Sequence, residues 1–115
     1  MERQIMTIES LEEVGANVEE GLARCLGKKD FYLKMVNMAL SNQNFELLGA
    51  SLKEKNFDRA FELCHSLKGV VGNVSLSPLY DSLCSLTEKL RSHADGDYDT
   101  LFGEVMAARE KFLSL

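Results

Sequence analysis

The chain has 115 residues, which is enough for one domain with a single modest hydrophobic core. Apolar residues make up 45% and charged residues 27%, a balance typical of globular proteins and not of disordered ones. The formal net charge of -5 argues against broad electrostatic binding to nucleic acid or to an anionic membrane.

The cysteines and the N-terminus indicate the compartment. Cys25, Cys64 and Cys84 are widely spaced and form no CxxC pair, which argues against a disulfide framework or a zinc site. The N-terminal stretch lacks the apolar region of a secretion signal, and no stretch approaches the length of a transmembrane helix. We therefore expect a cytoplasmic protein whose thiols are small core residues.

Helical periodicity dominates the chain, and no strand-like alternation competes with it. The first predicted helix runs from Glu12 to Leu26, and Gly27 would end it. A second helix is expected after Asp30, whose carboxylate would cap its N-terminus. Met35 and Met38 have helical spacing in this segment and are expected in the core.

The middle of the chain predicts three further helices. One begins near Asn42 or Asn44 and is closed by Asn56, and the next spans Phe57 to about Val74. Ser77-Pro78 predicts the start of another, because serine caps helices and proline is tolerated in the first turn.

The last predicted helix follows a polar loop, His93 to Asp97, and its apolar positions begin at Leu101. The aspartates of "DGDYD", Asp95 to Asp99, resemble the start of a calcium loop. However, Thr100 occupies the required glycine position and Met106 the position of the bidentate glutamate. We therefore expect no metal site here, and we expect His93 to be solvated surface.

Several amphipathic helices with short connections predict one all-α domain over residues 1–115. The last four helices are expected to form an antiparallel up-down-up-down four-helix bundle. The additional N-terminal helices would then cover one end of it. The initiator Met1 and the compact length favour a stand-alone protein over a domain cut from a longer chain.

The segment "FELCHSLKGVVGN", residues 61–73, combines two faces on a helical wheel. The predicted core face comprises Ala60, Leu63, Cys64, Leu67, Val70, Val71 and Val74. The opposite stripe comprises Asp58, Glu62, His65, Gly69 and Gly72, with Lys68 on its flank. His65 is therefore predicted to be exposed and Cys64 to be buried.

The composition of this stripe indicates a phosphoryl site. Glycine within a helix costs about 1 kcal/mol relative to alanine, so Gly69 and Gly72 suggest clearance for another macromolecule. Lys68, one turn after His65, places an ammonium group near whatever the imidazole holds. Neutral imidazole is a nucleophile, and lysine can neutralise phosphoryl oxygens.

These residues resemble a known family. "HSLKG", His65 to Gly69, matches the H-x-L-K-G signature of histidine-containing phosphotransfer (HPt) domains, the helical relay modules of multistep phosphorelays. The following Gly72-Asn73 and the helix order also match, so that the resemblance covers most of the chain. It implies a carrier and not an enzyme: His65 would accept a phosphoryl group on Nε2 from a receiver-domain aspartate and pass it to another receiver.

The resemblance also implies roles for the neighbours of His65. Lys68 would balance the phosphate charge, Gly69 would admit the receiver, and Gly72 lies in the same stripe. Phe61, one turn before His65, is the candidate for the apolar edge of the docking surface. Magnesium would come from the receiver, so no cofactor is implied for this chain. The expected partners are receiver domains of response regulators and hybrid histidine kinases, bound by a monomer.

Two positions depart from the family pattern. Ser75 stands where many members have glycine, and Cys64 stands where alanine is common. The chain has no nucleotide-binding signature, so autophosphorylation from ATP is not expected. A histidine-kinase dimerisation domain also exposes a histidine, but it needs an ATPase domain that this chain does not supply.

Plainer interpretations stay open beside this one. His65 and Lys68 would then be ordinary surface residues, Phe61 a packing residue, Gly69 a close helix crossing, and Gly72 a position that no partner covers. The alternative function is a non-catalytic helical adaptor, such as a degenerate relay domain that binds receivers without phosphotransfer.

Overall fold

The computed structural model describes residues 6–93 and 96–115, and these residues form seven α-helices and no strand. The helices are α1 (Ile8–Glu13), α2 (Val18–Arg24), α3 (Lys29–Leu40), α4 (Asn44–Lys53), α5 (Phe57–Asn73), α6 (Ser77–Arg91) and α7 (Tyr98–Leu113). The predicted all-α class is confirmed. Within the described ranges, no helix is both long and apolar enough to cross a membrane.

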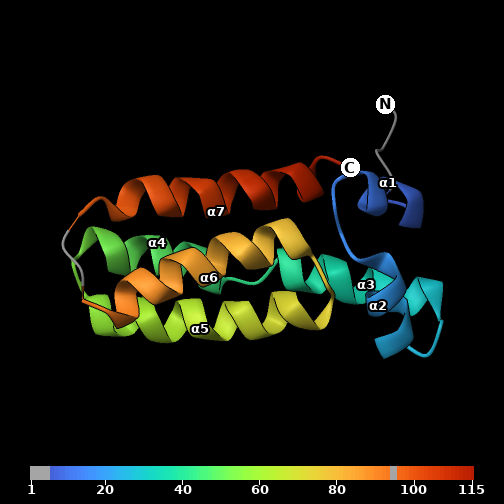
Figure 1. Ribbon diagram of the computed structural model, residues 1–115, viewed down its shortest axis with the longest axis horizontal. Helices are drawn as coiled ribbons and strands as arrows, with labels where there is room; N and C mark the ends of the chain where they lie inside the picture. Colours follow the sequence, from blue (N-terminus) through green and yellow to red (C-terminus); the bar gives the residue numbers. More distant parts are fainter. Residues whose placement is uncertain (1–5, 94–95) are drawn as a thin grey trace.

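Helices α4 to α7 lie side by side along the long axis of the molecule (Figure 1). Helix α5 packs against both α4 and α6, and α7 packs against α6 and α4. Helix α3 contacts α5 and α7, while α1 and α2 lie near the end where α5 turns into α6 (Figure 1). This arrangement places α5 between several neighbours and leaves one of its faces at the surface.

The apolar face of α5 is buried as predicted. Its fully buried side chains are those of Ala60, Cys64, Leu67 and Val71. They have the spacing of one face of an α-helix, and they join the side chains of every other helix in a single core. Leu63 and Val70, also predicted for this face, are only half-buried because they lie on its flanks.

The single helix predicted from Glu12 to Leu26 is wrong. Two short helices occupy this region, because Gly15 has a left-handed φ of 104° that interrupts helical geometry. The Asn17 side chain then accepts a hydrogen bond from the Glu20 amide at 3.2 Å and caps α2. Helix α2 ends at Arg24, two residues before the predicted end at Leu26. The Gly27 amide donates to the Leu22 carbonyl at 2.7 Å.

Helix α3 begins one residue before the predicted cap. Asp30 lies in its first turn, where a carboxylate is favourable beside the helix dipole, but it makes no capping hydrogen bond. The prediction that Met38 is in the core is also wrong, since its side chain is 57% exposed. The buried face of α3 instead contains Tyr32 and Val36, and Met35 is half-buried.

The remaining helix boundaries were predicted closely, with different caps. Helix α4 begins at Asn44. Asn56 was expected to close this helix, but it caps α5 instead, by accepting a hydrogen bond from the Arg59 amide at 3.3 Å.

The last two helices also begin close to their predicted starts. Pro78 does lie in the first turn of α6, but Leu76 and not Ser77 occupies the cap position. Asp97 caps α7 by accepting from the Thr100 amide at 3.0 Å. Asp95, from the rejected calcium loop, lies outside the described residues.

The end of α5 is tied to the N-terminal helices. The buried Tyr32 hydroxyl of α3 donates to the Val74 carbonyl at 2.8 Å, and burial raises the pKa of Tyr32 to about 12. The Asn17 amide donates to the Ser75 carbonyl at 2.9 Å. These bonds fix the turn between α5 and α6 against α2 and α3.

This packing predicts opposite effects for two helical glycines. A Cβ at Gly21 would lie 2.7 Å from the Tyr32 hydroxyl oxygen and closer still to its ring, whereas a Cβ at Gly103 would meet nothing within 4 Å. Gly21→Ala should therefore lower the free energy of unfolding by about 1–3 kcal/mol through overpacking. Gly103→Ala should raise it by about 0.5–1 kcal/mol through helix propensity. Urea unfolding followed by circular dichroism measures both, and a neutral Gly21→Ala would contradict the α2–α3 packing.

Candidate functional site

The candidate site lies on the outer face of α5. His65 is exposed, although it follows the fully buried Cys64 and precedes the buried Leu67 by two residues. This agrees with the helical wheel, because consecutive residues of a helix point about 100° apart. Asp58, Glu62 and Gly69 of the predicted stripe are also exposed.

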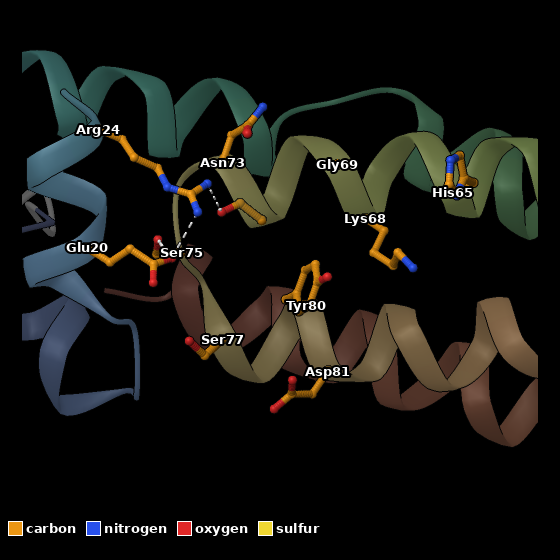
Figure 2. A pocket seen from close by; sticks show the side chains of 11 residues that line it. Glu20, Arg24, His65, Lys68, Gly69, Asn73, Ser75, Ser77, Tyr80 and Asp81 are labelled. Carbon is orange, nitrogen blue, oxygen red and sulfur yellow. Dashed lines mark hydrogen bonds and ion pairs between the residues drawn. The ribbon is translucent and has the colours of Figure 1, made fainter.

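A surface groove of about 450 Å³ begins at His65 and runs toward the C-terminal end of α5 (Figure 2). It is lined by His65, Lys68, Gly69, Gly72 and Asn73 of α5, by Ser77, Tyr80 and Asp81 of α6, by Glu20 and Arg24 of α2, and by Ser75. The structure thus brings four of the five predicted site residues, all except Phe61, to one groove. Lys68 is half-buried, and its side chain extends from α5 toward α6 (Figure 2).

The two glycines of the stripe differ in their surroundings. A Cβ at Gly69 would meet nothing within 4 Å, so no helix crossing among the described residues requires glycine there. A Cβ at Gly72 would lie 3.0 Å from Cε1 of Tyr80, which is tight contact with α6. The packing of α5 against Tyr80 therefore accounts for Gly72, whereas no such contact accounts for Gly69.

Phe61 lies on the other side of His65 from the groove. Its half-buried ring stacks on the imidazole, with ring centroids 6.0 Å apart and an interplanar angle of 17°. It borders a second hollow together with Phe57, Asp58, Glu62, Leu90, Arg91 and His93. His93 is exposed, as predicted.

Arg91 of α6 was not found from the sequence. Its Cζ lies 5.7 Å from the centroid of the Phe61 ring, and its Nη1 pairs with Glu88 Oε1 at 2.6 Å. The sequence holds no signal for this contact, because it depends on how α5 and α6 are aligned along each other.

The far end of the groove is closed by a polar network that was also missed. Arg24 donates from Nη1 to the Gly72 carbonyl at 3.0 Å, and its Nη2 lies 3.3 Å from Glu20 Oε1. The Ser75 hydroxyl donates to the same Glu20 oxygen at 2.8 Å (Figure 2). Ser75 has a left-handed φ of 57°. The network holds the last turn of α5, which positions one end of the groove.

The thiol beside His65 is not set up for chemistry. Burial raises the pKa of Cys64 to about 11, and the Thr87 hydroxyl lies 3.1 Å from its sulfur. A thiol that is buried and protonated at neutral pH is neither a nucleophile nor a redox sensor. No group of three or more His, Cys, Asp or Glu side chains in the described part of the chain could hold a metal ion.

Comparisons of the chain with protein-family models, with curated proteins and with solved structures find no significant match. The chemistry of the site itself is therefore the basis for a function. The arrangement offers an exposed imidazole, a neighbouring ammonium group and open helix backbone on one surface. Such a surface can bind an anionic group that a second macromolecule presents.

The difference between the two glycines can be measured. Gly69→Ala should raise the free energy of unfolding by about 0.5–1 kcal/mol, because alanine is the better helix former and its methyl group meets open space. Gly72→Ala should gain less or be destabilising, because Tyr80 must move. Equal effects of the two substitutions in urea unfolding would contradict the distinct roles assigned to them.

Proposed function

We propose that the chain is a histidine phosphotransfer protein of a multistep phosphorelay. His65 accepts a phosphoryl group from the aspartyl phosphate of one receiver domain and passes it to the aspartate of another. The observation that carries the proposal is the exposed His65 in mid-helix, with Lys68 in the same groove and unobstructed backbone at Gly69. An ordinary surface histidine requires neither neighbour.

The transfer step is a simple displacement at phosphorus. The lone pair of Nε2 of the neutral imidazole attacks the phosphorus atom, and the Nε2–P bond forms as the P–O bond to the aspartyl carboxylate breaks. The carboxylate leaves with the bonding electrons, and Nδ1 keeps its proton. The Lys68 ammonium stabilises the negative charge on the phosphoryl oxygens, and magnesium comes from the receiver.

Access favours a protein as the phosphoryl donor. The groove is open on one side, and the absence of a side chain at Gly69 allows another backbone to come close to α5. A partner must approach this closely, since its aspartate has to come within bonding distance of Nε2. His65 lies on a helix and not on a loop, which keeps the nucleophile in place during the approach.

The finer architecture belongs to the same proposal. We infer that α4 to α7 form an antiparallel up-down-up-down four-helix bundle, with α1 to α3 covering one end. Support comes from the packing of each of these helices on the next and of α4 on α7. Ser75 gives further support, because its φ of 57° suits the glycine common at this position in the HPt family.

The proposed protein is a carrier without kinase activity of its own, acting as a cytoplasmic monomer. Its partners are the receiver domains of response regulators and hybrid histidine kinases. A non-catalytic adaptor that binds the same receivers is the alternative, and phosphotransfer distinguishes the two.

The central test replaces each histidine separately. A panel of receiver domains is charged with acetyl phosphate and mixed with the protein, and phosphohistidine is detected by its loss in acid and survival in base. We expect His65→Gln to abolish labelling without loss of stability, because the side chain is exposed. His93→Gln is the matched control and should label normally. Receiver binding without labelling of the native protein would establish the adaptor instead.

Lys68 is expected to assist transfer without being essential. Lys68→Ala should slow phosphorylation of His65, because the variant lacks the positive charge that stabilises the phosphoryl oxygens. The effect should be limited to about tenfold, because water partly screens the half-buried ammonium group. Lys68→Arg should retain most of the rate, and Lys53→Ala, at the end of α4, serves as the control. Rapid-quench measurement of the transfer rate decides the point. An unchanged rate in Lys68→Ala would remove this lysine from the mechanism.

A further inference from the structure

The orientation of the His65 ring has a specific support inside the chain. Phe61 lies one turn earlier in α5, and its ring stacks on the imidazole with centroids 6.0 Å apart and planes 17° from parallel. Phe61 is half-buried and packs against the hydrophobic core, whereas His65 is exposed. The phenyl ring is therefore the fixed member of the pair, and the imidazole is the member that it can restrain.

A second helix holds the phenyl ring. The Arg91 guanidinium at the end of α6 lies over Phe61, with Cζ 5.7 Å from the ring centroid, within the range of a cation–π contact. Arg91 is itself held by Glu88, one turn earlier in α6, through an N–O contact of 2.6 Å. A chain of contacts thus runs from Glu88 through Arg91 and Phe61 to His65.

We propose that Phe61, restrained by Arg91, is a positioning residue that holds the His65 imidazole in one orientation and presents Nε2 to the partner. The inference rests on the proposed function, since the orientation matters only if His65 is the phosphoryl acceptor. An exposed histidine is otherwise free to populate several rotamers. Restricting them before the partner arrives keeps the nucleophilic nitrogen aligned and leaves Nδ1, nearer the backbone, out of the reaction.

Phe57 provides a matched control within the same helix. It lies one turn before Phe61 and is 36% exposed, and its ring stacks on Tyr98 with centroids 5.0 Å apart. It therefore resembles Phe61 in chemistry and location, but its ring partner is in α7 and not at the site. A general loss of packing should appear in both variants, whereas loss of positioning should appear only in Phe61 variants.

The stacking itself is tested by proton NMR without any phosphoryl group. In the native protein the ring protons of His65 should be shifted upfield by the Phe61 ring current. Phe61→Leu should remove that shift, and Phe57→Leu should leave it intact. His65 ring protons at random-coil positions in the native protein, or a shift insensitive to Phe61→Leu, would overturn the proposal.

The effect of Phe61 on phosphoryl transfer is tested with a phosphorylated receiver domain and with phosphoramidate. Attack on phosphoramidate forms an N–P bond to the imidazole and breaks the P–N bond to the leaving ammonia. Phe61→Leu should lower the maximal transfer rate from the receiver about tenfold with a smaller change in KM. Phosphorus NMR after phosphoramidate treatment should then show Nδ1-phosphohistidine beside the Nε2 form that dominates in the native protein.

The test is completed by conservative variants and by measuring the maximal transfer rate and KM separately. Phe61→Tyr and Arg91→Lys should stay near the native rate, and Arg91→Gln should fall between native and Phe61→Leu. A raised KM with an unchanged maximal rate in Phe61→Leu would overturn positioning and make Phe61 a docking residue. An upfield-shifted His65 in a protein that no receiver phosphorylates would instead refute the carrier function while leaving the stacked pair established.

Discussion

The rotational position of α5 in the core is the constraint on which the site depends. Four side chains on one face of this helix, those of Ala60, Cys64, Leu67 and Val71, are fully buried. Burying a leucine or valine side chain contributes about 1.5–3 kcal/mol, so Leu67 and Val71 alone oppose any rotation of α5 that would expose them. Because the helix is rigid, the same burial fixes the direction of every other side chain in it. His65 is exposed because Cys64 is buried, and the packing free energy of the core thereby directs the imidazole to the surface.

A helix that contains two glycines near its end also needs support there. The carbonyl groups of the last turn have no partners within the helix, and such ends fray unless other groups bind them. Here Arg24 donates to the Gly72 carbonyl, and the buried Tyr32 hydroxyl donates to the Val74 carbonyl. Hydrogen bonds of this kind contribute about 1 kcal/mol each, comparable to the helix propensity lost at one glycine. The N-terminal helices therefore stabilise the end of α5, on which the groove depends.

The features that the sequence predicted well are those set by local patterns. The bounds of α5, its buried face and the exposure of His65 follow from helical periodicity, which needs no knowledge of neighbouring helices. The break between α1 and α2 was missed because it depends on the positive φ of Gly15, packed near Pro78 from a distant part of the chain. The Arg91 contact was missed for a similar reason, since it requires the relative alignment of two helices. Periodicity alone does not give that alignment.

The two sides of His65 differ in a way that bears on how a partner approaches. On one side, Phe61 and Arg91 contact each other, and Arg91 is paired with Glu88, so an approach there has to displace existing interactions. On the other side, the groove contains Lys68, and Gly69 presents backbone with no side chain to move. The proposed carrier would benefit from this difference, because both receivers could approach from the groove side while the Phe61 side keeps the imidazole oriented. The proposed positioning thus gives Phe61 a role other than the docking edge expected from the sequence, and it leaves docking to the groove side of the same helix.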